Sequence, residues 1–158
     1  MLPTSTDWLQ RVPIFGALGE DSLRVLLERA RRVELARGGC LFREGTPAQS
    51  MFVLEHGQAA VIKQWQGREQ LLRQLQAGDC VGEMALMDLQ PRSATVRADS
   101  HSVFIEFSTD DLLRLYEHDL EQFALLQMNI GREVCRRLRT TDEALFALSM
   151  QLAAREAM

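Results

Sequence analysis

The chain has 158 residues, of which 46% are hydrophobic and 25% are charged, and its formal net charge is −4. This length and composition predict one globular domain over residues 1–158, with a core of its own. They exclude a membrane-spanning protein, because no apolar run approaches about 18 residues, and they argue against nucleic-acid binding by the whole surface, because neutralising phosphates requires a basic face.

Residues 1–30 are predicted to form short helices. Trp8, Leu9 and Val12 lie at helical spacing near the start of the chain. Further on, the tripeptide Glu-Asp-Ser at 20–22 supplies acidic and capping groups for the start of a second helix, which carries leucines at positions 23, 26 and 27. These helices precede the strand-rich part of the chain.

Residues 31–107 are predicted to form an antiparallel β-roll, similar to a jelly-roll barrel. Short segments rich in β-branched and aromatic residues alternate there with glycine-containing turns, a rhythm typical of small antiparallel barrels. Residues 51–75 are interpreted as three strands joined by tight turns at His56-Gly57 and Gln66-Gly67, where glycine supplies the positive φ.

Residues 108–158 are predicted to be helical, beginning with a cap at Ser108. A narrow apolar stripe follows at steps of three and four, and from position 138 onward it is a heptad seam. A small barrel cannot cover a stripe this long, so we expect a parallel homodimer through this helix, with a helix lying on its own barrel as the alternative. The stripe consists of Phe123, Leu126, Ile130, Val134, Leu138, Thr141, Leu145, Leu148 and Leu152.

The stretch GDCVGEMALMDLQPRSATVRA has the features of an anion site. Gly82 precedes an expected helix that starts at Glu83 and ends at a proline, and a helix start exposes unpaired N–H groups that a glycine lets a ligand approach closely. Arg92 and Ser93 then bring a fork-shaped cation and a hydroxyl toward the same place. Because Glu83 would repel a phosphate unless it accepted from a hydroxyl, the pattern predicts a ligand with a phosphate and a sugar hydroxyl close together, as in a cyclic nucleotide.

The segment GEMALMDLQPRSATVRA resembles the phosphate-binding cassette of the cyclic-nucleotide-binding domain family, which occurs in bacterial catabolite activator proteins, kinase regulatory subunits and nucleotide-gated channels. The segments VPIFGAL and LFREGTPAQSMFVLEHGQAAV and the heptad helix also resemble that family. The resemblance implies an α+β fold with short N-terminal helices, a β-roll that carries the cassette at 82–95, and a long dimerising C-terminal helix. The cassette pattern is matched at Gly82, Glu83, Ala85, Leu86, Pro91, Arg92, Ala94 and Thr95.

The resemblance implies a role for each matched site residue. Arg92 and Ser93 would hold the cyclic phosphate, together with the backbone around Gly82, Met84 and Ala85. Glu83 would accept a hydrogen bond from the ribose 2′-hydroxyl.

Four further residues are expected around the ribose and base. Val61 and Leu72 match apolar positions that line the family's pocket, although ordinary barrel core is an equally good interpretation. RRLRTTDEAL is similar to the segment of the catabolite activator that reaches the adenine, which would place Thr141 against the base. Asp142 stands where the activator has a serine, and its carboxylate would accept from an exocyclic amine, with a surface aspartate as the alternative.

These features predict a sensor domain without catalytic activity or cofactor. The expected ligand is cyclic AMP, with cyclic GMP as the other candidate, since a threonine in place of Ser93 would suggest cyclic GMP by resemblance. Binding is expected to favour a docked position of the C-terminal helix and so to act on an effector protein that the sequence does not identify. The alternatives are the sensing fragment of a transcription regulator whose DNA-binding domain is absent from this chain, and a protein-interaction module that keeps the fold without binding nucleotide.

Other kinds of site are not expected. The three cysteines and three histidines are isolated, which argues against disulfides and against a metal centre. The basic run at 132–139 lacks interleaved aromatic residues and is interpreted as a solvated face or a set of ion-pair partners, so no DNA contact is expected. No basic and apolar leader opens the chain, so we expect a cytoplasmic protein without membrane contact.

Overall fold

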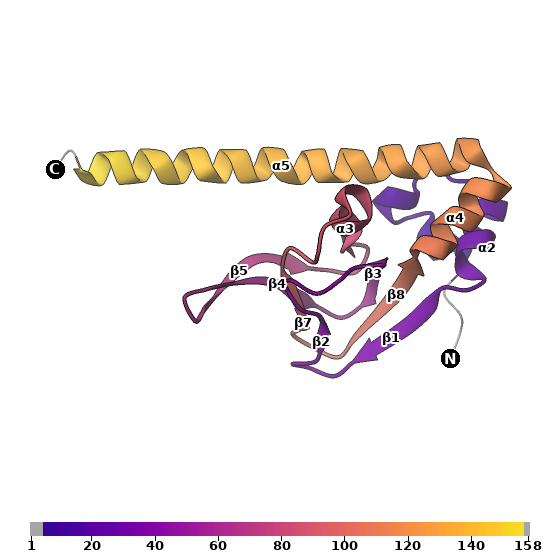
Figure 1. Cartoon of the computed structure of the whole chain (residues 1–158), viewed down its shortest axis with the longest axis horizontal. Coiled ribbons are helices and arrows are strands. Elements are labelled where there is room, and N and C mark those ends of the chain that lie inside the picture. The colour runs from indigo at the N-terminus through magenta and orange to yellow at the C-terminus, as the bar shows by residue number, and fades with distance from the viewer. Residues whose placement is uncertain (1–4, 157–158) are drawn as a thin grey trace.

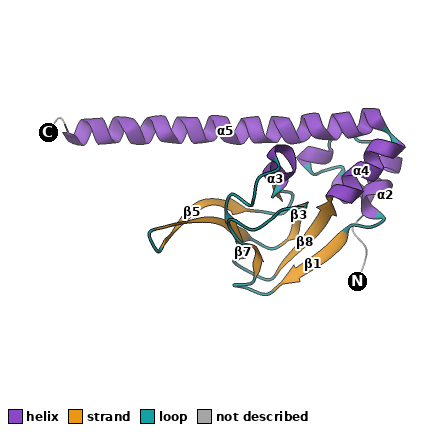
Figure 2. Ribbon diagram, in the orientation of Figure 1, coloured by secondary structure: helices purple, strands orange, loops and turns teal. Residues whose placement is uncertain are grey.

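Two four-stranded antiparallel sheets, several short helices and one long helix make up residues 5–156, the part of the chain that the computed structural model describes (Figure 1). The predicted α+β class, with helices on either side of a strand-rich middle, is confirmed (Figure 2). The strands are β1 (Arg31–Leu35), β2 (Cys40–Phe42), β3 (Ser50–His56), β4 (Ala59–Trp65), β5 (Arg68–Leu75), β6 (Cys80–Val81), β7 (Thr95–Ala98) and β8 (Ser102–Ser108). The helices are α1 (Thr6–Leu9), the 3-10 turn η1 (Pro13–Phe15), α2 (Glu20–Leu27), α3 (Glu83–Asp88), α4 (Thr109–His118) and α5 (Leu120–Glu156).

The strands form an open roll. One sheet has the order β1-β8-β3-β6 and the other has the order β2-β7-β4-β5. The three strands expected within residues 51–75 are β3, β4 and β5, and the turns between them carry Gly57 at φ 94° and Gly67 at φ 76°. Because β1, β6, β2 and β5 remain at sheet edges, the two sheets do not close into the barrel that the jelly-roll comparison implied.

Strand β3 is buried on both faces and so contributes to two cores. Met51 and Val53 pack with the helices, whereas Phe52 and Leu54 pack between the two sheets with residues of the opposite sheet such as Val96. This alternation follows from the two-residue period of a strand. The first sheet therefore separates a helix-covered core from the core inside the roll.

The predicted cap of α2 is wrong in its residues. The N-cap residue of α2 is Gly19, which has no side chain to form a capping hydrogen bond. Ser22, which we expected to supply a capping group, is buried, while Glu20 and Asp21 lie in the first turn, where carboxylates favour the helix dipole. The N–H of Gly19 instead donates to Gln122 Oε1 of α5 at 2.7 Å, so the partner of this N–H comes from a distant segment.

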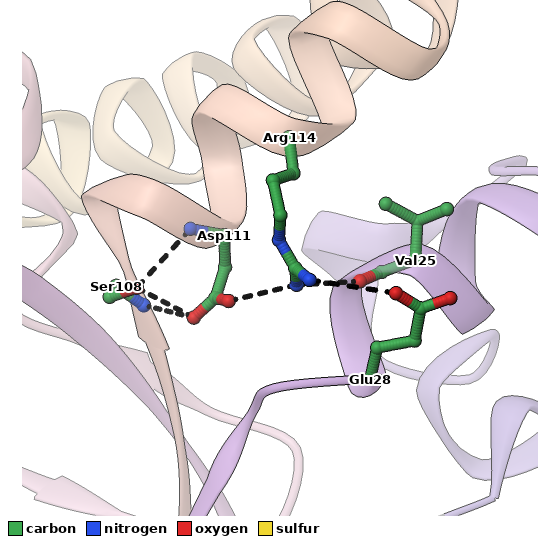
Figure 3. A network of polar contacts seen from close by, with 5 residues as sticks. All are labelled: Val25, Glu28, Ser108, Asp111 and Arg114. Atoms are coloured by element: carbon green, nitrogen blue, oxygen red, sulfur yellow. Dashed lines mark hydrogen bonds and ion pairs between the residues drawn. The ribbon is translucent and has the colours of Figure 1, made fainter.

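The predicted cap of α4 is confirmed, and it is part of a network that ties α4 to α2 (Figure 3). Ser108 Oγ accepts from the N–H of Asp111 at 3.2 Å, and the Asp111 carboxylate accepts from the N–H of Ser108 at 2.8 Å. Arg114 donates to Asp111 and to the carbonyl oxygen of Val25, both at 3.0 Å, and its guanidinium lies 3.5 Å from Glu28. The segment leading into α5 is thereby held against the N-terminal helices.

Helix α5 has 37 residues and two different environments. Leu126 and Ile130 in its first half are buried in the helix-covered core, and Asn129 donates to the carbonyl oxygen of Gly16 at 2.8 Å. The second half runs past the sheets (Figure 1). Its exposed large apolar residues are Leu138, Leu145, Phe146, Leu148, Met150 and Leu152. Within residues 5–156, none of the helices has the length and apolar character needed to cross a membrane.

Candidate functional site

The cassette segment, residues 82–95, leaves β6 at a left-handed glycine. Gly82 has φ 81° and is the N-cap of α3, and a β-carbon there would collide with the guanidinium of Arg92. Both the conformation and the space therefore require glycine. The predicted end of the helix at Pro91 is wrong: α3 ends at Asp88, because Leu89 takes a left-handed φ of 56° and turns the chain before the proline.

Arg92 is buried, with a relative exposure of 6%. Its guanidinium stacks on Phe42 at 4.1 Å from the ring centroid and donates to the carbonyl oxygen of Gly82 at 3.2 Å and to Ser50 Oγ at 3.4 Å. Nε has no hydrogen-bond partner among residues 5–156. Burial lowers the pKa of Arg92, and the nearby carboxylates of Glu106 and Glu83 oppose that shift. An arginine remains charged under such conditions, so this buried cation has donor capacity left for a ligand.

Glu83 is the most buried carboxylate of the site, with 1% relative exposure. Its Oε1 forms an ion pair with Arg137 of α5, whereas its Oε2 has no hydrogen-bond partner within the described chain. The sequence predicted that Glu83 needs a neighbouring group to face, and the structure supplies an arginine for one of its two oxygens. The other oxygen remains available as an acceptor.

A cavity of about 820 Å³ lies between the roll, α3 and α5, where Figure 1 shows α3 directly beneath the long helix. Its walls include both the cassette segment and the middle of α5, segments about fifty residues apart in sequence. Nine of the ten residues predicted for the site line it: Val61, Leu72, Gly82, Glu83, Met84, Ala85, Arg92, Ser93 and Thr141.

Asp142 is the one predicted site residue that does not line the cavity. Successive residues of a helix point about 100° apart, so the turn of α5 that brings Thr141 to the cavity directs Asp142 elsewhere. Asp142 is exposed, and of the two interpretations left open for it the structure favours the surface aspartate.

Sequence reasoning missed several cavity residues. Arg73 lies on β5 and donates to the carbonyl oxygen of Cys80 at 3.2 Å, and the period of that strand could have placed it on the same face as buried Leu75. Arg137 was interpreted only as part of a basic run, because its ion pair with Glu83 spans 54 residues of sequence. The other missed residues at the α5 side are Glu133, Val134, Arg136, Leu138 and Thr140.

The described residues contain no cluster of three or more His, Cys, Asp or Glu side chains that could hold a metal ion. Cys80 is the cysteine nearest the site, and it is buried beside Glu83 and Arg137. Burial, followed by the charge of Glu83, raises the pKa of its thiol well above the usual range, and a buried thiol of this kind is unreactive. The polar side chains that line the cavity carry guanidinium, carboxylate, hydroxyl and amide groups.

Comparison with protein families gives a match over residues 32–119 to the cyclic nucleotide-binding domain. The cAMP-dependent protein kinase regulatory subunit of Emericella nidulans is 28% identical over 108 residues, which are 68% of this chain and 26% of that protein. The Cyclic AMP receptor protein of Thermus thermophilus is 27% identical over 142 residues, which are 89% of this chain and 64% of that protein. This chain thus spans about a quarter of the length of the first relative and less than two thirds of the second.

A solved structure is similar over most of the chain. The N-terminal domain of a transcriptional regulator from Streptomyces coelicolor A3(2) superposes with a TM-score of 0.72 and 31% sequence identity, covering 88% of this chain and 95% of that one. Sequence profile, relatives and fold therefore agree on one family.

Proposed function

The chain belongs to the cyclic nucleotide-binding domain family, and from that premise we propose that it is a regulatory domain that binds cyclic AMP in the cavity between the roll and α5. One observation carries the proposal. Two buried, oppositely charged residues of the cassette segment, Arg92 and Glu83, line the same cavity, and each has one buried polar atom without a partner among residues 5–156. Buried polar atoms are normally paired, so the pair fits a ligand that offers both an anion and a hydroxyl.

The ligand would use these groups in a defined order along the cavity. The cyclic phosphate would accept from Arg92, from Ser93 and from the backbone N–H groups of Met84 and Ala85, because charge-assisted bonds to an arginine are the strongest available there. The ribose 2′-hydroxyl would donate to Glu83 Oε2, and Val61 and Leu72 would supply apolar contacts. The names of the relatives and the serine at position 93 favour cyclic AMP over cyclic GMP.

Binding would be coupled to α5. The ligand would contact the cassette segment on one side and Thr141 on the other, so the state with α5 held over the cavity would gain contacts that an undocked helix lacks. The ion pair between Glu83 and Arg137 already joins the two sides. Micromolar affinity corresponds to roughly 8 kcal/mol, of which one charge-assisted bond to Arg92 contributes on the order of 1.5–3 kcal/mol.

The exposed half of α5 supports a homodimer as part of the same proposal. Leu145, Leu148 and Leu152 have relative exposures of 61%, 54% and 52%, and a helix with a heptad apolar seam in water is stabilised by pairing with another helix. A regulatory role without catalysis agrees with the relatives, whose names describe a kinase regulatory subunit, a receptor protein and a transcriptional regulator. The cytoplasmic location and the effector protein stay predictions.

The proposal is tested by isothermal titration of the full chain with cyclic AMP and cyclic GMP, beside Arg92→Ala. We expect micromolar or tighter binding of cyclic AMP, and a loss of at least about tenfold in the variant, because one charge-assisted bond is worth roughly that much. Arg24→Ala is the control, since Arg24 is 61% exposed on α2, away from the cavity, and its affinity should equal that of the original protein.

Two results would contradict the proposal. Unchanged affinity in folded Arg92→Ala would remove the phosphate assignment. Absence of binding in the original protein would favour the protein-interaction module, and the search would turn to proteins that contact α5.

A second candidate function is favoured by the likeness to the N-terminal domain of a transcriptional regulator. In that case the domain would be the sensing part of a DNA-binding protein. Reading the gene beyond the codon for Met158 decides between the two, since a helix-turn-helix segment in frame would support the regulator.

A further inference from the structure

The guanidinium of Arg92 is enclosed between the ring of Phe42 and the backbone of Gly82. Its central carbon lies 4.1 Å from the centre of the Phe42 ring. A β-carbon on Gly82 would collide with Nη1 of Arg92 and would come within 3.4 Å of the same ring. The guanidinium therefore fills the space between ring and backbone, and its plane has little room to turn.

Phe42 reaches this place because β2 is irregular. The register of β2 against β7 shifts between Cys40 and Phe42, and a bulge of this kind redirects side chains that a regular strand would keep on one face. Cys40 accordingly lines a separate, polar hollow beside Glu69 and Arg97. Phe42, in contrast, packs against the core of the roll and lines the cavity that contains Arg92.

The ring contacts Arg92 without using its hydrogen bonds. A guanidinium carries all of its N–H donors in one plane, and here Nη1 donates to the carbonyl oxygen of Gly82, Nη2 donates to Ser50 Oγ, and Nε has no partner among residues 5–156. The negative face of an aromatic ring attracts a cation from above or below that plane. Phe42 can therefore hold the plane while the unpaired donor stays free for a ligand.

We propose that Phe42 is a positioning residue for anion binding: its ring holds the guanidinium of Arg92 in the plane from which the free donors reach the anion. The inference rests on the proposed function, in which that anion is the cyclic phosphate. A side chain that is already fixed loses less freedom on binding, which raises affinity. Phe52 is the other aromatic residue near Arg92, but its ring centre is 5.5 Å away and it belongs to the core between the sheets.

The test is a double-mutant cycle in the full chain, with Phe42→Leu and Arg92→Ala made singly and together. Phe42→Leu removes the ring face and keeps an apolar side chain. Isothermal titration with cyclic AMP measures the affinity of each variant. We expect Phe42→Leu to weaken binding roughly three- to tenfold in the original protein, and less than about twofold when Arg92 is already alanine, because the ring then has no guanidinium to hold.

Three further variants make the result specific. Phe42→Tyr keeps the ring face and should keep the affinity of the original protein. Phe42→Met is a second variant without a ring and should repeat the loss seen with leucine. Phe15→Leu removes an aromatic ring from the helix-covered core, outside the cavity, and should leave the affinity for cyclic AMP unchanged.

The outcomes separate this inference from the function on which it rests. A loss of the same size with and without Arg92 would show that Phe42 acts only as a wall of the cavity. That result, or full affinity in the variants without a ring, would overturn the positioning role and leave the nucleotide site in place. Failure of the original protein to bind cyclic AMP would overturn both proposals.

Discussion

The half of α5 that precedes Arg137 lies against the rest of the protein, whereas the half that follows it extends beyond the sheets (Figure 1). Leu126 is fully buried, whereas Leu145 is 61% exposed. Both belong to one apolar stripe, whose members follow one another at steps of three and four residues. The spacing of apolar residues along a helix therefore defines its apolar face, while the surrounding fold decides whether that face is covered within one chain.

The boundary between the two halves coincides with the candidate site. Arg137 and Thr141, which line the cavity, lie between Val134, the last α5 position that packs against the helix-covered core, and the exposed Leu145. A ligand in the cavity would therefore act at the point where α5 leaves the body of the protein.

The largest effect is expected in the packed half. Ile130→Ala removes three buried carbons from the helix-covered core, and we expect the free energy of unfolding to fall by about 3–4 kcal/mol through lost burial and the cavity left behind. Urea denaturation measures this change. Leu113→Ala is the control, because Leu113 is 53% exposed on α4. Equal losses in the two variants would show that the packed half is not distinguished by burial.

The exposed half should control association instead. Replacing both Leu145 and Leu152 with Glu places like charges along the proposed dimer seam, and we expect the dimer dissociation constant to rise at least about a hundredfold. Sedimentation equilibrium measures it. Phe146→Glu changes an equally exposed residue one position off the seam and should leave the dimer intact. If the original protein is monomeric, the proposed dimer through the heptad seam is wrong.

A smaller effect is expected at the boundary. Arg137→Ala leaves the buried carboxylate of Glu83 without its arginine, and because Arg137 itself is 22% exposed, we expect a loss of about 2 kcal/mol in unfolding free energy, below the range for fully buried pairs. Arg136→Ala is the neighbouring control, since Arg136 is 63% exposed in its ion pair with Glu133, and exposed charges contribute little to stability. Similar small changes in both would mean that the ion pair does not hold α5 to the cassette segment.

The smallest effect tests the outer side of the packed half. Gly131 has nothing within 4 Å of where a β-carbon would lie, so Gly131→Ala should raise the unfolding free energy by about 0.5–1 kcal/mol through helix propensity. Thermal denaturation measures the gain. A weakened dimer in this variant would show instead that the dimer interface continues into the first half of α5. The two halves would then not differ in whether they pair with a second chain.

Local patterns in the sequence were sufficient for the strand-rich middle, the helix cap at Ser108 and the gathering of the cassette residues at one place. Each depends on neighbours within a few residues. The partners that required folding were not accessible in this way: Arg137 for Glu83, Phe42 beneath Arg92, and Gln122 at the start of α2. These contacts join segments that approach only when the roll and α5 are assembled.

The errors have physical causes of the same kind. The cap expected at Ser22 failed because that side chain is needed in the core, and a residue of α5 meets the N–H of Gly19 instead. For Asp142 the sequence left two interpretations open, contact with the base and a surface aspartate, because a resemblance of segments does not specify the direction of a side chain around a helix.

The uninterrupted run of α5 gives the molecule a lever arm. From Arg137 to the last described helical residue, Glu156, the helix extends for roughly 28 Å at about 1.5 Å per residue. A pivot of about 10° at the cavity would carry the far tip through roughly 5 Å, one full helical turn of displacement. Under the proposed coupling, a small rearrangement of hydrogen bonds around a ligand would therefore move the tip far enough to change where a second helix can pack.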